Sequence, residues 1–184
     1  MSTPNILLDC DGVLADFVTG TICAHGIRDF DHDDVDCWAY YEKWGLTAAQ
    51  FWDKCSGREF WETLPPYPWA VELYRKLSEI GEVTIVTSPP RDPEACTGKM
   101  NWLRAVLGID PGQVFVGSRK SLMARYDNIL IDDHTGNTDP FEAHGGAVFL
   151  FPQPWNGYAN GTWQRVVERT RGYAEFVNLA KKAG

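Results

Sequence analysis

The chain has 184 residues, of which 44% are hydrophobic and 23% charged, an ordinary composition for a globular protein. This length allows one compact domain with a sizeable core, or a core with a small insertion. The formal net charge of −8 argues against nonspecific binding to a nucleic acid polymer or an anionic membrane, but not against a small anionic substrate beside a local cation. No apolar stretch reaches membrane-spanning length.

Cysteine usage indicates a reducing compartment. The five cysteines are odd in number and form no C-x-x-C pair, which argues against a disulfide framework. The first strand is predicted close to the N-terminus, with neither a basic region nor an apolar signal core before it, so secretion is not indicated. We therefore expect a cytoplasmic location.

Predicted strands and helices alternate along most of the chain. The first apolar run is continuous, as expected of a strand buried on both faces of a parallel sheet. In chain order the predicted strands span residues 5–8, 83–86, 114–116, 129–131 and 147–151, and the predicted helices span 69–80, 98–107 and 162–182. This β-α-β alternation favours an α/β fold with a doubly wound parallel sheet.

The segment 17–66 differs in character, because it is rich in aromatic and acidic residues. Thr47 followed by Gln50 resembles a capping box and predicts that a helix begins there. We interpret this segment as a small helical cap domain inserted after the first strand, with the core domain formed by residues 1–16 and 67–184. The loop 152–161, rich in proline, asparagine and glycine, has no role that the sequence assigns.

Polar side chains follow three of the predicted strands at the point where each strand ends. They are the acids Asp9 and Asp11, the hydroxyl pair Thr87 and Ser88, and the acid pair Asp132 and Asp133, with Lys120 shortly before the last pair. The carboxyl ends of the strands in an open parallel sheet line one crevice, where ligands bind. Carboxylates, hydroxyls and an ammonium group at one place indicate a magnesium-assisted phosphoryl-transfer site.

The order of these motifs resembles the haloacid dehalogenase-like phosphohydrolase superfamily. Longer strings also resemble the 5'(3')-deoxyribonucleotidases, and the likeness extends from residue 5 to about residue 150; the strings span residues 9–17, 60–72, 87–89 and 130–133. The resemblance implies a Rossmann-like haloacid dehalogenase core with a cap. It also implies an Mg²⁺-dependent phosphatase that removes 5' or 3' phosphates from deoxyribonucleoside monophosphates, a small-molecule nucleotide substrate.

The resemblance implies a role for each acid. Asp9 is the expected nucleophile, which forms an aspartyl-phosphate. Asp11 is the expected general acid and then general base, and its backbone carbonyl is expected to face the metal. Asp133 completes the Mg²⁺ site with Asp9, while Asp132 either reaches the metal through water or orients Lys120.

Phosphate binding is expected to involve hydroxyl, amide and basic groups. The Thr87 hydroxyl and backbone amides near Ser88 are expected to donate to the phosphoryl oxygens. Lys120 is expected to neutralise charge that builds up on the phosphoryl group during transfer. By the same resemblance, Arg91 occupies a position from which a basic residue reaches phosphate.

Cap aromatics are expected to select the substrate. Phe17 and Trp38 match aromatic residues of the family, although Cys37 stands where the family has a phenylalanine before the tryptophan. Trp52 and Trp61 are further candidates, with the core of the cap as the alternative role for any of these rings. A flat apolar slot suits a nucleobase, and a buried apolar wall near C2' would favour deoxyribose over ribose.

Other readings of the sequence stay open. A sugar phosphate or another small phosphomonoester would need the same chemistry with a different cap. A receiver-type signalling domain also gathers acids, a hydroxyl and a lysine on a parallel sheet, but its acid pair lies on the first strand and it lacks this aromatic insertion. A relative that only binds nucleotides is the weakest alternative. Base preference and oligomeric state, a homodimer included, stay open as well.

Overall fold

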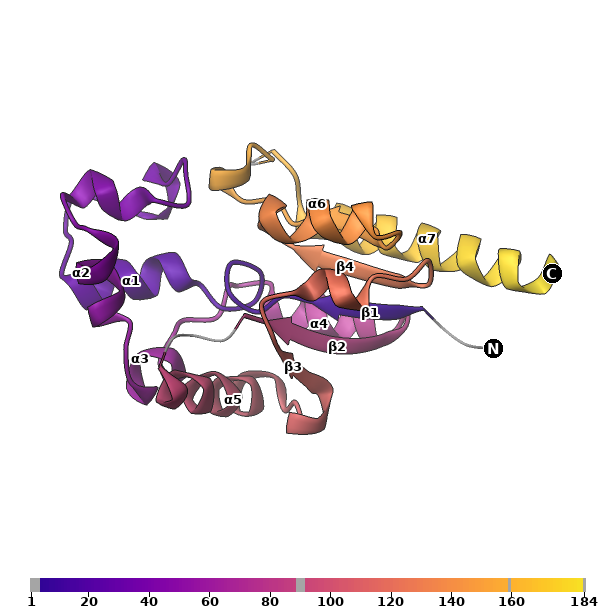
Figure 1. The fold of residues 1–184 in the computed structure, drawn as a ribbon, viewed down its shortest axis with the longest axis horizontal. Helices are drawn as coiled ribbons and strands as arrows, with labels where there is room; N and C mark the ends of the chain where they lie inside the picture. The colour runs from indigo at the N-terminus through magenta and orange to yellow at the C-terminus, as the bar shows by residue number, and fades with distance from the viewer. Residues whose placement is uncertain (1–3, 89–91, 159, 184) are drawn as a thin grey trace.

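A five-stranded parallel sheet forms the centre of the computed structural model, which describes residues 4–88, 92–158 and 160–183 (Figure 1). The strands are β1 (Asn5–Leu8), β2 (Glu82–Thr87), β3 (Val114–Val116), β4 (Asn128–Asp132) and β5 (Ala147–Leu150), in the spatial order β3-β2-β1-β4-β5. The central strand β1 pairs with both β2 and β4, so that Asn5 lies opposite Glu82 on one side and Asn128 on the other. The predicted doubly wound α/β class is confirmed.

Helices cover both faces of this sheet. They are α1 (Phe17–His25), α2 (Ala48–Lys54), α3 (Arg58–Glu62), α4 (Ala70–Ser78), α5 (Pro93–Leu107), α6 (Thr135–Ala143) and α7 (Trp163–Ala183). Because side chains alternate along a strand, Ile6 and Leu8 of β1 join one buried cluster with residues of α4, α5 and α7, whereas Leu7 joins a second cluster with Phe141 of α6.

The helices α1, α2 and α3 lie together beyond the carboxyl ends of the strands (Figure 1). The capping box predicted for α2 is confirmed, because the Thr47 hydroxyl accepts from the Gln50 amide and the Gln50 side chain accepts from the Thr47 amide at 2.9 Å. The last of these helices, α3, packs closely on α5, since a Cβ added at Gly98 would lie 2.3 Å from the Arg58 carbonyl oxygen. The division into a core and a cap domain stays a prediction.

Two helices differ from the sequence prediction. The helix α5 begins at Pro93 rather than at residue 98, because the Asp92 carboxylate accepts from the Glu94 amide at 3.0 Å and proline suits the first helical position. The helix α6 is not predicted from the sequence. It begins where His134 accepts from the Gly136 amide, and it contains an internal proline, Pro140.

Over the residues that the structure describes, none of the helices has both the length and the apolar character required to cross a lipid bilayer. The cysteines, Cys10, Cys23, Cys37, Cys55 and Cys96, are free thiols. The expected cytoplasmic location stays a prediction.

Candidate active site

Three aspartates form the floor of the candidate site. Asp9 follows β1, Asp132 is the last residue of β4, and Asp133 comes directly after it. All three are buried, and each offers a carboxylate oxygen within 4.8 Å of one from each of the others. The parallel sheet brings the first strand and the later acid pair together as the sequence predicts.

A buried lysine lies among these acids. The Nζ atom of Lys120, a residue only 2% exposed, is 2.8 Å from Asp9 Oδ1 and 2.7 Å from Asp132 Oδ2. Burial alone would lower the pKa of Lys120, but the two carboxylates raise it above its usual value, so the ammonium stays charged. Asp132 also accepts from the His134 amide at 2.9 Å and from the Asn137 side chain at 3.1 Å. These hydrogen bonds fix the orientation of the carboxylate that pairs with Lys120.

Burial also shifts the pKa values of Asp9 and Asp133. It raises the pKa of Asp9 from 3.8 to about 7, and the charge of Asp132 adds to this effect while Lys120 opposes it. The pKa of Asp133 is raised well above its usual value by burial and then by Asp132 and Asp9. Three carboxylates thus face a single ammonium group, and a divalent cation would relieve their repulsion.

The approach of Gly12 to Asp133 leaves no space for a side chain. Gly12 has φ +78°, and a Cβ there would lie 2.5 Å from the Asp133 Oδ2 atom. Buried carboxylate oxygens close to a tight turn are the ligands that a hard divalent cation prefers. The residues present therefore fit Mg²⁺, with Asp9 and Asp133 as the groups that would hold it.

A second buried lysine, Lys99 of α5, enters the site from the other side. It is 4% exposed, and its ammonium group donates to the Asp11 carboxylate, to Thr87 Oγ1 at 2.9 Å and to the Ser88 carbonyl at 3.2 Å. Lys99 also lies 4.5 Å from the centroid of the Trp61 ring. Among the described residues, Asp11 Oδ1 is buried without a hydrogen-bond partner.

Sequence reasoning missed Lys99, although one signal was present. The helix predicted over 98–107 places Trp102 and Leu103 on its inward face, and Lys99 precedes them by three and four residues. Residues at these spacings share one face of a helix. A lysine on the apolar face of a helix was therefore visible from the sequence alone.

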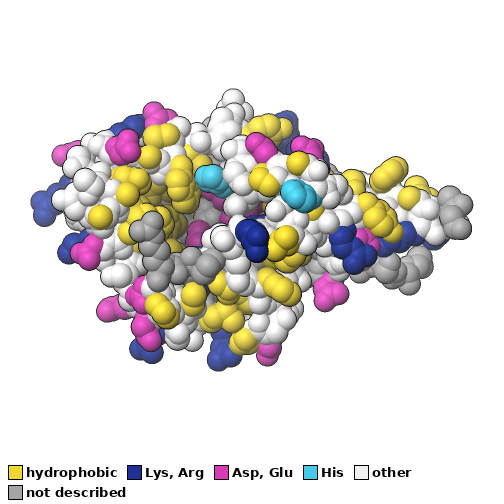
Figure 2. All heavy atoms as spheres, viewed as in Figure 1, with side chains coloured by type: hydrophobic (Ala, Val, Ile, Leu, Met, Phe, Trp, Pro, Cys, Tyr) yellow, Lys and Arg dark blue, Asp and Glu magenta, His cyan; other side chains and the backbone are white. Residues whose placement is uncertain are grey.

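A cavity of about 250 Å³ lies above the aspartates. All four aromatic residues that the sequence analysis named as candidates for substrate binding line it, namely Phe17, Trp38, Trp52 and Trp61. The other lining residues are Asp9, Asp11, Ser88, Lys99, Asp133, His134 and Asn137. In Figure 2 acidic side chains are visible inside the central hollow, and hydrophobic side chains gather on its cap side. The fold thus joins an acidic floor to an aromatic wall.

The aromatic wall is layered. Phe17 is 3% exposed and stacks on Trp61, with ring centroids 5.4 Å apart and an interplanar angle of 21°. Trp38 also stacks on Phe17, with ring centroids 6.3 Å apart and an interplanar angle of 16°, and it is 39% exposed. Phe17 and Trp61 therefore belong to the core of the cap as well as to the cavity, while Trp38 presents the more open ring. The predicted phosphate ligand Arg91 lies outside the described residues.

The sequence comparisons agree on one family. Residues 3–181 match the model of the family described as "5' nucleotidase, deoxy (Pyrimidine), cytosolic type C protein". A Bordetella pertussis protein named "Putative 5'(3')-deoxyribonucleotidase" is 33% identical over 169 residues, which are 82% of this chain and 84% of that protein. A Bordetella bronchiseptica protein of the same name is 31% identical over the same shares of the two chains.

Solved structures agree on the fold. A haloacid dehalogenase-like family hydrolase from Xanthomonas campestris superposes with a TM-score of 0.58 at 13% identity, over 95% of this chain and 94% of that one. The Bacillus subtilis HAD-hydrolase YfnB gives 0.55 at 14% identity, over 82% and 87%. Because the family match covers nearly the whole chain and the sequence relatives exceed 30% identity over most of it, this chain belongs to the deoxy, cytosolic type C 5'-nucleotidase family of hydrolases with the haloacid dehalogenase fold.

Proposed function

We propose that the protein is an Mg²⁺-dependent phosphatase that hydrolyses the 5' or 3' phosphate of deoxyribonucleoside monophosphates. The observation that carries the proposal is the convergence of Asp9 and Asp133, with ligand oxygens within 4.8 Å, beside an aromatic-walled cavity. The names of the Bordetella relatives support this substrate class. The Bacillus subtilis neighbour was crystallised bound to magnesium, and a Deinococcus radiodurans HAD-family neighbour with a TM-score of 0.52 was crystallised with phosphate and sodium.

Asp9 and Asp11 would carry out the reaction in two steps. The Asp9 carboxylate attacks phosphorus, and the bond from phosphorus to the ester oxygen breaks as Asp11 donates a proton to that oxygen. Asp11 then takes a proton from water, which attacks the phosphorus of the aspartyl-phosphate and releases inorganic phosphate and free Asp9. Bound Mg²⁺ would supply charge neutralisation of the phosphoryl oxygens in both steps.

Basic and hydroxyl groups would hold the phosphoryl group during these steps. Lys120 keeps the Asp9 carboxylate oriented through its 2.8 Å contact and offsets negative charge on the transferred group. Lys99 lines the cavity and donates to the Thr87 hydroxyl just beneath it, so that the two groups would donate to phosphoryl oxygens. Both lysines are buried, so their charges act in a medium of low dielectric, where they have more effect than in water.

The aromatic wall would bind the rest of the substrate. Trp38 offers a partly exposed ring for a nucleobase, and the buried rings of Phe17 and Trp61 would make a ribose hydroxyl costly to bury. The alternative substrate is a sugar phosphate or another small phosphomonoester, which would need the same floor but no stacking partner.

The test is phosphate release from dTMP, dUMP, UMP, a sugar phosphate and para-nitrophenyl phosphate, each with and without Mg²⁺. We expect Asp9→Asn and Asp11→Asn to lose about a thousandfold or more in kcat, because each removes a group that acts in bond making or breaking. The exposed Asp29 gives the matched control Asp29→Asn, which should behave like wild type. Wild-type rates for both site variants on every ester would refute the proposal.

A further inference from the structure

The turn after β5, to which the sequence assigned no role, makes direct contact with the floor of the site. It consists of Gln153 and the short 3₁₀ helix Pro154–Asn156. The Trp155 Nε1 atom donates to Asp133 Oδ2 at 2.7 Å, and the Asn156 side chain donates to the Asp133 carbonyl at 2.8 Å. The Gln153 side-chain amide donates to the carbonyl of Gly12. This 153–156 turn therefore binds both the segment after β4, at Asp133, and the segment after β1, at Gly12.

The contact with Asp133 involves the group that would hold the metal. A carboxylate has about four lone-pair positions, so one N–H donor fixes its orientation and still leaves positions for a cation. Gly12 also approaches this carboxylate so closely that any side chain there would collide with Asp133 Oδ2. Partners of this kind orient metal ligands, and their loss typically weakens metal binding about 10–100-fold.

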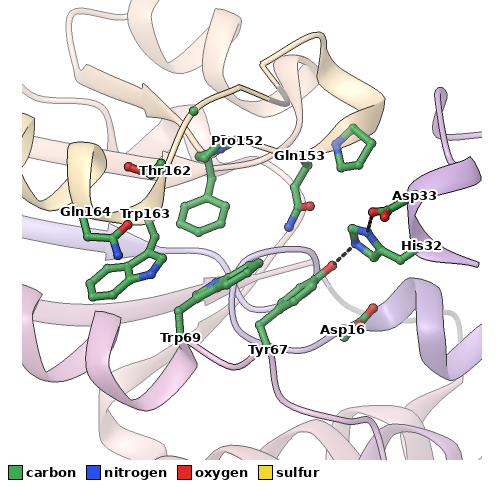
Figure 3. A pocket seen from close by; sticks show the side chains of 13 residues that line it. Asp16, His32, Asp33, Tyr67, Trp69, Pro152, Gln153, Thr162, Trp163 and Gln164 are labelled. Carbon is green, nitrogen blue, oxygen red and sulfur yellow. Dashed lines mark hydrogen bonds and ion pairs between the residues drawn. The ribbon is translucent and has the colours of Figure 1, made fainter.

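The 153–156 turn is itself held in place from the cap side. The centroid of the Trp155 indole lies 5.6 Å from that of the His32 ring and 6.3 Å from that of the Trp38 ring, and both pairs are T-shaped. His32 in turn hydrogen-bonds the Tyr67 hydroxyl at 3.0 Å. Figure 3 shows this side of the turn, where Gln153 lines a second cavity of about 490 Å³ together with His32 and Tyr67. The indole is thus packed between cap residues and the acidic floor.

We propose that Trp155 is a positioning residue, whose indole N–H holds the Asp133 carboxylate in the orientation that binds Mg²⁺. The proposal rests on the proposed function, since it takes Asp133 as a metal ligand. Asn156 and Gln153 assist by fixing the backbone of Asp133 and Gly12. Trp155 acts through Asp133 and takes no part in bond making.

The test compares Trp155→Phe, which keeps an aromatic ring and loses the N–H, with Trp44→Phe. Trp44 is a suitable control because its Nε1 atom is buried and has no hydrogen-bond partner in the described part of the chain. Isothermal titration calorimetry would measure Mg²⁺ binding to each protein without substrate. We expect the Mg²⁺ dissociation constant to rise about 10–100-fold for Trp155→Phe and to stay near wild type for Trp44→Phe.

Activity gives a second readout. Excess Mg²⁺ should restore most of the kcat of Trp155→Phe, because the reacting groups are intact. Trp155→Leu, which lacks both ring and N–H, should show the same loss of Mg²⁺ affinity. Mg²⁺ affinity of Trp155→Phe equal to that of Trp44→Phe, or a loss confined to Trp155→Leu, would overturn the proposal.

A separate variant distinguishes this proposal from the proposed function. Asp133→Asn removes the ligand itself, so it should abolish Mg²⁺ binding and Mg²⁺-dependent phosphate release. If Asp133→Asn behaves like wild type, the proposed function fails. If Asp133→Asn loses Mg²⁺ while Trp155→Phe does not, only the role of Trp155 fails.

Discussion

The ammonium group of Lys99 donates a hydrogen bond to Asp11 Oδ2, although 88 residues separate the two in the chain. The same ammonium reaches Thr87 Oγ1 at 2.9 Å and lies 4.5 Å from the centroid of the Trp61 ring. Helix α5 thus delivers a buried positive charge to the expected general acid, next to the expected phosphate ligand. The helices α5 and α3, the strand β2 and the turn after β1 therefore meet at this one side chain, and its loss would remove contacts with all of them.

Removing the charge of Lys99 should weaken catalysis strongly. For Lys99→Met we expect a fall in kcat/KM of about 100-fold or more, because a preorganised donor to the phosphoryl oxygens is lost. Steady-state kinetics on dTMP with saturating Mg²⁺ would measure the change. The exposed Lys54, at the end of α2, provides the control Lys54→Met, for which we expect wild-type kinetics. Equal rates for the two variants would contradict the role given to Lys99.

The metal-free protein should lose stability as the pH rises from about 4 to about 7. The pKa of Asp9 is about 7 in the folded protein, against an ordinary value of 3.8. Between these values the folded state keeps a proton that the unfolded state has lost, so the favourable contribution is complete at low pH and disappears as the pH passes 7. The shift corresponds to about 4 kcal/mol at most.

Thermal melts in EDTA of wild type and Asp9→Asn, from pH 4 to pH 8, would measure this contribution. Because asparagine stays neutral, Asp9→Asn should gain stability relative to wild type as the pH rises. Added Mg²⁺ should stabilise wild type more at pH 8 than at pH 5, since metal binding requires the ionised carboxylate. A constant difference between the two proteins across this range would exclude the raised pKa.

Trp38 should matter for nucleotides and not for small esters. Its partly exposed ring lines the cavity, so Trp38→Ala should raise KM for dTMP about tenfold, within the range of base stacking energies. Activity on para-nitrophenyl phosphate should change little. The control is Phe176→Ala, because Phe176 is exposed on α7, away from the cavity. Equal losses of Trp38→Ala on both substrates would argue against base stacking.

The contact between α3 and α5 can be tested with a pair of glycine substitutions. A Cβ at Gly98 would lie 2.3 Å from the Arg58 carbonyl oxygen and 2.9 Å from the Trp61 Cβ atom. Gly98→Ala should therefore destabilise the protein by about 1–3 kcal/mol through overpacking. At Gly172 in α7 a Cβ would meet no described atom within 4 Å apart from the helix's own backbone, so Gly172→Ala should stabilise the protein by about 0.5–1 kcal/mol. Urea denaturation of both variants measures the two free energies, and effects of the same sign would contradict this packing.

The sequence predicted those features whose signal is local. Continuous apolar runs marked the strands, and the residues directly after them, such as Asp9 and Asp133, form the acidic floor. The helix α6 was missed because the acid pair before its N-cap, His134, was interpreted as part of a metal site, and because the internal Pro140 argues against a helix. The contacts of Lys99 with Asp11 and of Trp155 with Asp133 depend on tertiary packing, which no local pattern encodes.

The position of β1 in the sheet has a consequence for how the chain reaches its native state. Of the five strands this one is synthesised first, yet its two partners, β2 and β4, extend to residues as late as Ile131. Until those partners are synthesised, the apolar nascent strand has two open edges, which invite aggregation. The segment that carries Asp9 therefore acquires its two neighbouring strands only after a long stretch of chain has been made, and the sheet around it cannot form before then.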